Sequence, residues 1–448
     1  MNFYKIIFIV FTFLNFSKAY ALPPTPKINV NKIDTKILKI AKPATINYIM
    51  VPIVGMVDTF WVSKLGSTTD LAAVGSGDQI FYIYYSLMAF LPIIITPEIS
   101  KLYNKNKNDE ISNIINISGI LSIILGSFGI ILYFKTNTFA NFFINQNSNI
   151  YSKAIQYLKV RSIAMPFCLI NSVIFSILRG MSSYDSAIKI NIITQFVNLI
   201  LDPFLMMKYN LKGVAFASVL SEILCSIAFI KLLFKKNIIK PNIYSFKYKT
   251  LQFLRLGVFI QMKYLLINML YITINKRLLF IDNTGNQLAA HIVMSKFLSI
   301  TDILYRGLST TATTIIPIEI INYNDDIMRK RLYYWANIIA IFQSFMFLNL
   351  RFVIKHFTSD PIIINICKKL LITTTIYQYL DGFNTIQEGI LQGYQKFKLS
   401  STVSFITTIP LIYFLSKSNN IYNLWKVGTS ILFFKTIMLY IISNNKKI

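Results

Sequence analysis

Long apolar stretches recur along the whole chain, and they constrain its fold more than any other feature. A helix needs about twenty apolar residues to cross a bilayer, and the stretches here alternate with short polar loops. With 54% hydrophobic and 14% charged residues among 448, we predict an all-α polytopic membrane protein with twelve spans. The expected spans are residues 42–62, 71–97, 111–134, 159–179, 186–207, 213–234, 253–276, 287–316, 331–353, 362–390, 397–416 and 421–442.

The net charge of +27 could suggest a nucleic-acid-binding protein, but the Lys and Arg residues lie in short runs between the apolar spans. There they fit the positive-inside rule and the attraction of anionic headgroups. We therefore expect membrane lipids as partners, no nucleic acid, and a monomer. Cys168, Cys225 and Cys367 stand isolated in apolar surroundings, so we interpret them as packing residues rather than metal ligands or disulfides.

The N-terminus has the pattern of a targeting segment at residues 1–21. Lys5 precedes an apolar core, and the small-x-small sequence AYA permits cleavage after Ala21. A signal anchor is the alternative, since the apolar core is almost long enough to span a membrane. Residues 22–41 are basic and contain prolines, so we expect a linker or a transit-like stretch.

The chain divides into two similar lobes, 42–234 and 253–448, on either side of a central basic loop at 235–252. Three short sequences recur at similar spacing, which indicates an internal repeat. Six spans return the chain to its starting side, so the two copies have the same orientation. The recurring pairs are LAAVGSGDQI and LAAHIVMSKF, IITPEI and IIPIEI, and ILRG and ILQG.

Lys and Arg are more numerous on the side that holds the mature N-terminus, the central loop and the C-terminus. By the positive-inside rule this side faces the cytoplasm or an equivalent compartment. A cleaved secretory signal would instead place the mature N-terminus, Leu22, in the lumen and so invert this orientation. A two-step address to a plastid membrane resolves the conflict; the plasma membrane or an endomembrane is the alternative.

Two acids of the first lobe lie at apparent membrane depth, where a carboxylate is expensive and functional by default. Asp202 belongs to a polar face of the span at 186–207, and Asp58 follows Pro52 and Gly55, which can bend the helix. With Asn198, the two acids could form a site for sodium or for a shared proton. The alternative is that each acid caps a helix or pairs with a lysine. The face consists of Asn191, Thr194, Gln195, Asn198 and Asp202.

The second lobe has longer polar stripes at helical spacing. Asp302 and Arg306 are four apart and should pair with each other. Asp381 and Glu388 have no such partner in their own helix, so with Gln378 they are candidates for a second coupling site or for a cationic substrate. His291 and Lys263 are also ionisable at apparent membrane depth, but a lone His at a span end is more often a satisfied interface residue. We interpret the aromatic run at 81–86 as packing, with contact to flat organic substrates as the alternative. The stripes are His291, Ser295, Ser299, Asp302, Arg306, Ser309 and Thr313, and Thr374, Gln378, Asp381, Thr385, Glu388 and Gln392.

No catalytic motif is recognisable. The sequence has no P-loop, no HExxH, no nucleophile elbow and only two histidines. We therefore expect neither an enzyme nor a bound cofactor beyond a coupling ion, H⁺ or Na⁺.

Three segments carry a family resemblance: VDTFWVSKLGSTTDLAAVG at 57–75, LRGMSSYDSAIKINIITQFVNLILDP at 178–203 and GVAFASVLSE at 213–222. They resemble the multidrug and toxic compound extrusion (MATE) family, and the VDT opening is most similar to its DinF-type branch, which includes plastid members. The resemblance implies twelve helices in two six-helix lobes, alternating access, and export of organic compounds against protons or sodium.

By position, the resemblance assigns Asp58, Asn198 and Asp202 to the cation site of the first lobe, with Ser221 where a Thr often completes it. Asp381 matches an acid used in the second lobe by other branches. The span at 253–276 lacks the Glu of some branches, which argues against sodium coupling of that kind in the second lobe.

The combined hypothesis is a secondary antiporter that exports a small organic solute, including cationic xenobiotics, in exchange for protons or sodium. A lipid or lipid-linked flippase is the alternative if the cavity is strongly basic and open to the lipid. A non-transporting channel or scaffold is an alternative of another class, which the two buried acids count against.

Overall fold

The computed structural model describes residues 30–141, 143–144, 146, 150–238, 246–282, 284–322, 324–356 and 360–444. The predicted targeting segment at 1–21, the first part of the predicted linker, and the side chain of Pro52 lie outside the described residues. Within the described ranges every regular element is a helix, so the all-α prediction is confirmed.

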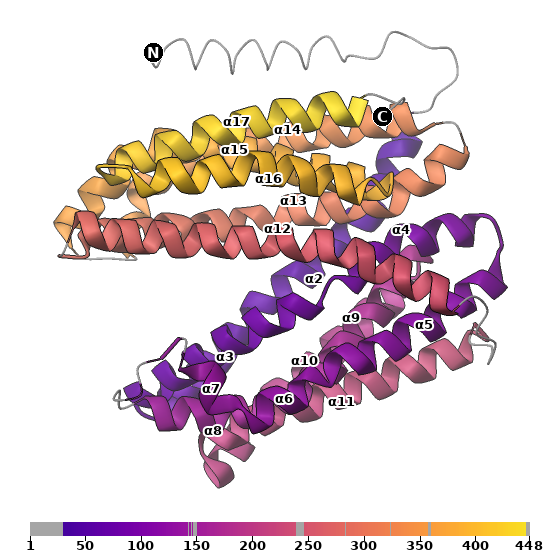
Figure 1. Cartoon of the computed structure of the whole chain (residues 1–448), viewed down its shortest axis with the longest axis horizontal. Coiled ribbons are helices and arrows are strands. Elements are labelled where there is room, and N and C mark those ends of the chain that lie inside the picture. Colours follow the sequence, from indigo (N-terminus) through magenta and orange to yellow (C-terminus); the bar gives the residue numbers. More distant parts are fainter. Residues whose placement is uncertain are drawn as a thin grey trace.

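The helices form two bundles, drawn apart in Figure 1. Each of the twelve predicted spans corresponds to one helix or to consecutive helices. The first lobe contains α2 (Val30–Leu65), α3 (Thr68–Met88), α4 (Leu91–Asn104), α5 (Asn108–Gly126), α6 (Phe128–Phe134), α7 (Thr136–Ala140), α8 (Tyr151–Arg161), α9 (Met165–Gly180), α10 (Tyr184–Tyr209) and α11 (Leu211–Lys235). The second lobe contains α12 (Phe246–Ile281), α13 (Asn286–Ile321), α14 (Asp325–Asn349), α15 (Pro361–Gly393), α16 (Phe397–Ser416) and α17 (Ile421–Asn444).

Eight of the described helical stretches are long and apolar enough to cross a membrane, and the bent pair of α3 and α4 makes a ninth. The span predicted as one helix at 71–97 is therefore two helices that meet at 45°. The bend falls just before Pro92, in the first turn of α4, where the missing N–H of proline is tolerated.

Two boundaries were predicted wrongly because they were placed by apolarity alone. Residues 30–41 belong to α2 and are not a linker, and residues 246–252 belong to α12 and are not part of a loop. In both segments charged side chains of the helix have partners in the other lobe. Lys36 pairs with Glu319 of α13, and Lys249 Nζ lies 3.1 Å from Glu98 Oε1 of α4.

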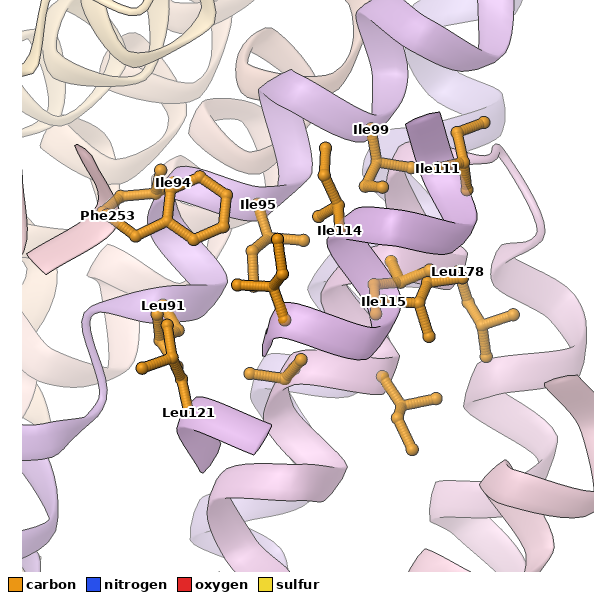
Figure 2. Close-up of a cluster of buried hydrophobic side chains, with 14 of the residues drawn as sticks. Leu91, Ile94, Ile95, Ile99, Ile111, Ile114, Ile115, Leu121, Leu178 and Phe253 are labelled. Atoms are coloured by element: carbon orange, nitrogen blue, oxygen red, sulfur yellow. The ribbon is translucent and has the colours of Figure 1, made fainter. Parts of the chain in front are cut away.

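The apolar cores of the two lobes are joined at one end of the molecule. Figure 2 shows Ile94 and Ile95 of α4 packed among isoleucines of α5, with Phe253 of α12 beside them. In the other direction, Ile37 and Ile40 of α2 are buried in a cluster with residues of α13 to α15. The start of α2 thus packs on the second lobe, and the start of α12 packs on the first.

A glycine allows a close approach between the lobes. A Cβ atom on Gly307 of α13 would lie 2.1 Å from Thr45 Oγ1 of α2, so no larger residue fits there without movement. Between membrane helices such small residues are favoured, because association depends on close packing rather than on a hydrophobic driving force.

We call the side on which α2 begins and α17 ends the terminal side; it lies at the right of Figure 1, where the lobes converge, and the lobes diverge toward the opposite side. Polar contacts between the lobes also lie near the terminal side. Asp34 accepts hydrogen bonds from Arg331 (2.9 Å) and Trp335 (3.0 Å). Ser100 donates to the carbonyl of Thr314 at 2.6 Å. The structure is therefore closed at this side.

Candidate functional site

Four residues predicted for the first lobe lie together between α2, α10 and α11. The Asn198 amide nitrogen is 3.4 Å from Asp58 Oδ1 and 3.5 Å from Asp202 Oδ2. The Ser221 hydroxyl shares its proton between Asn198 Oδ1, at 3.2 Å, and the carbonyl of Ser218, at 2.9 Å. Asn198, Asp202 and Ser221 are buried. We call these four residues the first-lobe carboxyl site.

The sequence of α10 explains this arrangement. Asn198 and Asp202 are one turn apart on one face, while the opposite face presents exposed apolar side chains such as Ile193 and Phe204. Pro203 has no N–H for the carbonyl of Leu199, so α10 lacks one regular backbone hydrogen bond about one turn before Asp202. A polar face toward the helix bundle and an apolar face toward lipid is the expected arrangement for a membrane helix with an intramembrane acid.

A second charged cluster lies beside this site and was missed by the sequence analysis. Tyr157 of α8 donates to Asp78 Oδ1 of α3 at 2.7 Å, and Arg161 Nε lies 3.7 Å from the same oxygen. The Arg161 guanidinium also lies over the ring of Phe81. Asp78 and Arg161 both act electrostatically on Asp202. The cost of an acid within an apolar span, which identified Asp58, would also have identified Asp78.

The second lobe contains a cavity of about 680 Å³, with α12, α13, α15, α16 and α17 supplying most of its wall. The whole predicted stripe of α13, from His291 to Thr313, lines this cavity. Of the predicted stripe of α15, Asp381, Thr385, Glu388 and Gln392 line it, but Gln378 and Thr374 do not.

Gln378 is instead buried, and its amide donates to Gln343 Oε1 of α14 at 3.0 Å. Gln378 therefore does not line the cavity, although its position in the predicted stripe of α15 suggested that it would. A stripe that repeats every seven residues drifts around a helix by about 20° per heptad. Over the two heptads from Thr374 to Glu388 this drift turns the first members of the stripe away from the cavity wall.

Four basic and three acidic side chains line the cavity. The predicted pair of Asp302 and Arg306 is confirmed. Glu388, predicted to lack a partner in its own helix, has two partners from other helices: Lys263 of α12, and Lys435 of α17 at 2.9 Å. Asp381 differs, since its carboxyl makes no hydrogen bond or ion pair with the described residues. The basic residues are Arg179, Lys263, Arg306 and Lys435; the acids are Asp302, Asp381 and Glu388.

Other predicted residues have structural roles. His291 is buried at the cavity wall, with its ring centroid 5.4 Å from that of Trp425. In the run at 81–86, Phe81 stacks on Tyr85 and Tyr84 packs on Phe139, which supports the packing interpretation. The three cysteines are buried and free. Among the described residues, no group of three or more His, Cys, Asp and Glu side chains could hold a metal ion.

A family model decides the identification. The model named MatE matches residues 43–204 and 260–416, one segment in each lobe. The chain belongs to the MatE family. The sequence-based assignment to this family of transporters is thereby confirmed, and the chain is an integral membrane protein with a transport function.

Curated relatives agree with this assignment. DNA damage-inducible protein F of Escherichia coli is 23% identical over 42% of this chain and 42% of its own length. The probable multidrug resistance protein NorM of Thermotoga maritima is 23% identical over 82% of each chain. Protein DETOXIFICATION 44, chloroplastic, of Arabidopsis thaliana is 27% identical over 47% of this chain and 43% of its own length.

A solved structure shows that the fold is that of MATE transporters, with twelve helices in two lobes. It is described as the outward-facing conformation of a multidrug resistance MATE family transporter. This MatE chain superimposes on it with a TM-score of 0.82, at 20% identity, over 92% of this chain and 95% of the other.

Proposed function

We propose that this MatE protein is a secondary antiporter that exports a small organic solute in exchange for protons bound at the first-lobe carboxyl site. The observation that carries the proposal is the pair of acids that share Asn198. Two close carboxyl groups bind a positive charge more readily than one, because the bound charge relieves their repulsion. Exchange of that charge between the two sides can drive alternation between lobe arrangements.

The orientation of Asn198 supports protons over sodium as the coupling ion. Its amide nitrogen faces both acids, and its oxygen accepts the Ser221 hydroxyl. A sodium ion is bound by oxygen atoms, so this amide would have to turn and release Ser221 before it could bind sodium. A proton on one carboxyl requires no such change.

The cavity supports an organic solute rather than a lipid-linked substrate. A flippase was expected to have a strongly basic cavity, but acids and bases here are nearly balanced. Its volume of about 680 Å³ lies within the range of small-molecule pockets. NorM, by its name, is a probable multidrug resistance protein. A non-transporting scaffold would have no need of two acids at membrane depth. We propose that the protein acts as a monomer.

We propose a plastid membrane as the location. The predicted two-step targeting signal motivates this proposal, and a relative named as chloroplastic supports it. A reporter fused after Ile448 should then be found in a stroma-like compartment; its appearance in the secretory lumen would contradict the proposal.

Transport in proteoliposomes tests the function. A cationic dye, ethidium, and an anionic dye, carboxyfluorescein, are offered under an imposed pH gradient and then under a sodium gradient. We expect a pH gradient to drive transport of one dye, and Asp58→Asn to abolish it. Glu110→Gln is the control, since Glu110 is a surface acid of α5 paired with Lys107. A failure of both gradients to move either dye would contradict the proposal. Transport driven by the sodium gradient alone would show that the coupling ion is sodium and not the proton.

A further inference from the structure

Glu388 is held between two lysines that come from two other helices of the cavity wall. Lys263 of α12 contacts Glu388 Oε2, and Lys435 of α17 lies 2.9 Å from Glu388 Oε1. All three side chains are largely buried, with relative exposures of 9%, 16% and 17% for Lys263, Lys435 and Glu388. All three also line the cavity. We call Lys263 and Lys435 the lysine pair.

The group contains two positive charges and one negative charge. A buried charge without a counter-charge is costly at membrane depth, because neither water nor lipid solvates it. Arg179 is a further basic residue of the cavity wall and donates a hydrogen bond to Thr96 Oγ1. As a base it cannot neutralise the lysines. Asp381 lies two turns before Glu388 on α15, an axial separation of about 10 Å; it interacts electrostatically with Lys435 but forms no ion pair with either lysine among the described residues. Lys263, Lys435 and Glu388 together therefore carry an excess positive charge, which a second anionic group would neutralise.

We propose that the second-lobe cavity binds a small organic anion whose carboxylate, sulfonate or phosphate group contacts Lys263 and Lys435, with Glu388 as the built-in counter-ion that this group displaces. The substrate class rests on the proposed export of a small solute. The apolar or aromatic body of the ligand packs on aromatic side chains of the same wall, among them Tyr271, Tyr377 and Trp425. Aromatic rings provide broad contact area for a flat ligand.

The sign of one mutational effect separates an anionic from a cationic substrate. If an anion competes with Glu388 for the lysines, Glu388→Gln removes the competitor and binding becomes tighter. If a cation binds, the same change removes an attractive charge and binding becomes weaker. Glutamine has nearly the shape of glutamate, so the change is chiefly one of charge.

Equilibrium binding to the full-length protein in phosphatidylcholine nanodiscs tests the proposal. The probes share one fluorophore: dansylglycine is an anion, its methyl ester is neutral, and dansylcadaverine is a cation. Energy transfer from Trp425 at the cavity wall to the dansyl group reports binding, and Trp425→Phe identifies that part of the signal. We expect dansylglycine to bind about tenfold more tightly than either other probe.

Four variants give the decisive comparison. Glu388→Gln should tighten dansylglycine binding by about tenfold, and Lys435→Gln should weaken it by a similar factor. Lys263→Arg, which keeps the charge, and Glu110→Gln, which changes a surface acid of α5 outside the cavity, should change it about twofold or less. Size-exclusion profiles identify any variant that fails to fold. If Glu388→Gln does not fold, Lys435→Gln still tests the proposal. Stronger binding of dansylcadaverine, weakened by Glu388→Gln, would overturn it, as would dansylglycine binding that is unaffected by Lys435→Gln.

The anionic group could belong to a free organic acid or to a lipid headgroup. Repeating the titration in nanodiscs that contain phosphatidylglycerol distinguishes them: competition assigns the lysine pair to a headgroup, and its absence to a free acid. The assay uses no ion gradient, so a protein that binds dansylglycine but transports nothing would contradict the proposed function alone. Transport that depends on Asp58 without anion binding at the lysines would contradict only this inference.

Discussion

The two lobes have similar helix orders but use their buried acids in different ways. In the first lobe, Asp58 and Asp202 share an amide in a packed helix interface, and neither lines the large cavity. In the second lobe, Glu388 is held by two lysines at the wall of a cavity of about 680 Å³. A small group of close acids suits a proton, whereas a wide cavity with fixed charges of both signs suits an organic solute.

Asp202→Asn should break this division of roles most severely. Without one acid of the pair, the two carboxyl groups no longer repel each other, so the site no longer binds a proton readily. We expect gradient-driven transport to fall by at least about 100-fold. Transport in proteoliposomes measures this, with Glu110→Gln as the control. Dansylglycine binding should stay within about twofold of wild type. If solute binding fell as far as transport, the roles of the two lobes would not be separate.

Glu388→Ala compared with Asp381→Ala examines the second lobe by itself. Both acids belong to α15 and line the cavity, but only Glu388 leaves two buried lysines without a counter-ion when it is removed. We expect a loss of about 3 kcal/mol of stability for Glu388→Ala and about 1 kcal/mol or less for Asp381→Ala. Thermal unfolding in detergent measures the difference, and dansylglycine should restore part of it for Glu388→Ala. Equal losses in the two variants would show that the lysines do not depend on Glu388.

The first lobe could be predicted largely from the sequence, for a physical reason. An acid in an apolar span is expensive wherever it points, so Asp58 and Asp202 can be recognised from their own surroundings. Helical spacing then placed Asn198 on the face of Asp202, and the family resemblance added Ser221. Asp78 satisfies the same criterion and was overlooked, although it lies beside the site.

The second lobe could be predicted only in part, because its charges are balanced between distant helices. Periodicity correctly grouped the cavity-lining residues of α13, from His291 to Thr313. It could not show that Lys263 reaches Glu388, since these residues are 125 positions apart. Helical spacing gives partners within one helix and says nothing about pairing between helices. For the same reason the charged helix ends, such as residues 30–41, were predicted to be a linker.

Gly307→Ala tests the close contact between α2 of the first lobe and α13 of the second. The added methyl group would lie 2.1 Å from Thr45 Oγ1, so α2 and α13 must separate. We expect a destabilisation of the closed terminal side by about 1–3 kcal/mol. Labelling of a Ser100→Cys variant, which faces Thr314 across the lobe contact, should become faster. Gly428→Ala is the matched control, because its nearest neighbour would be 3.8 Å away, at Tyr377. Unchanged labelling in Gly307→Ala would show that this contact does not hold the lobes together.

Ser221→Ala is the smallest change and the most specific test of how the first-lobe carboxyl site is positioned. The hydroxyl is hydrogen-bonded to neither acid; its partners are Asn198 Oδ1, at 3.2 Å, and the carbonyl of Ser218 in its own helix, at 2.9 Å. Loss of one neutral hydrogen bond is worth about 1 kcal/mol, which corresponds to about a fivefold change in the proton concentration needed for half-maximal transport. The maximal rate should be nearly unchanged, because both acids remain. Ser221→Thr, which keeps the hydroxyl, should behave like wild type. If Ser221→Ala instead abolished transport in the way that Asp202→Asn does, Ser221 would have to bind the coupling ion itself, and sodium would then become the better candidate.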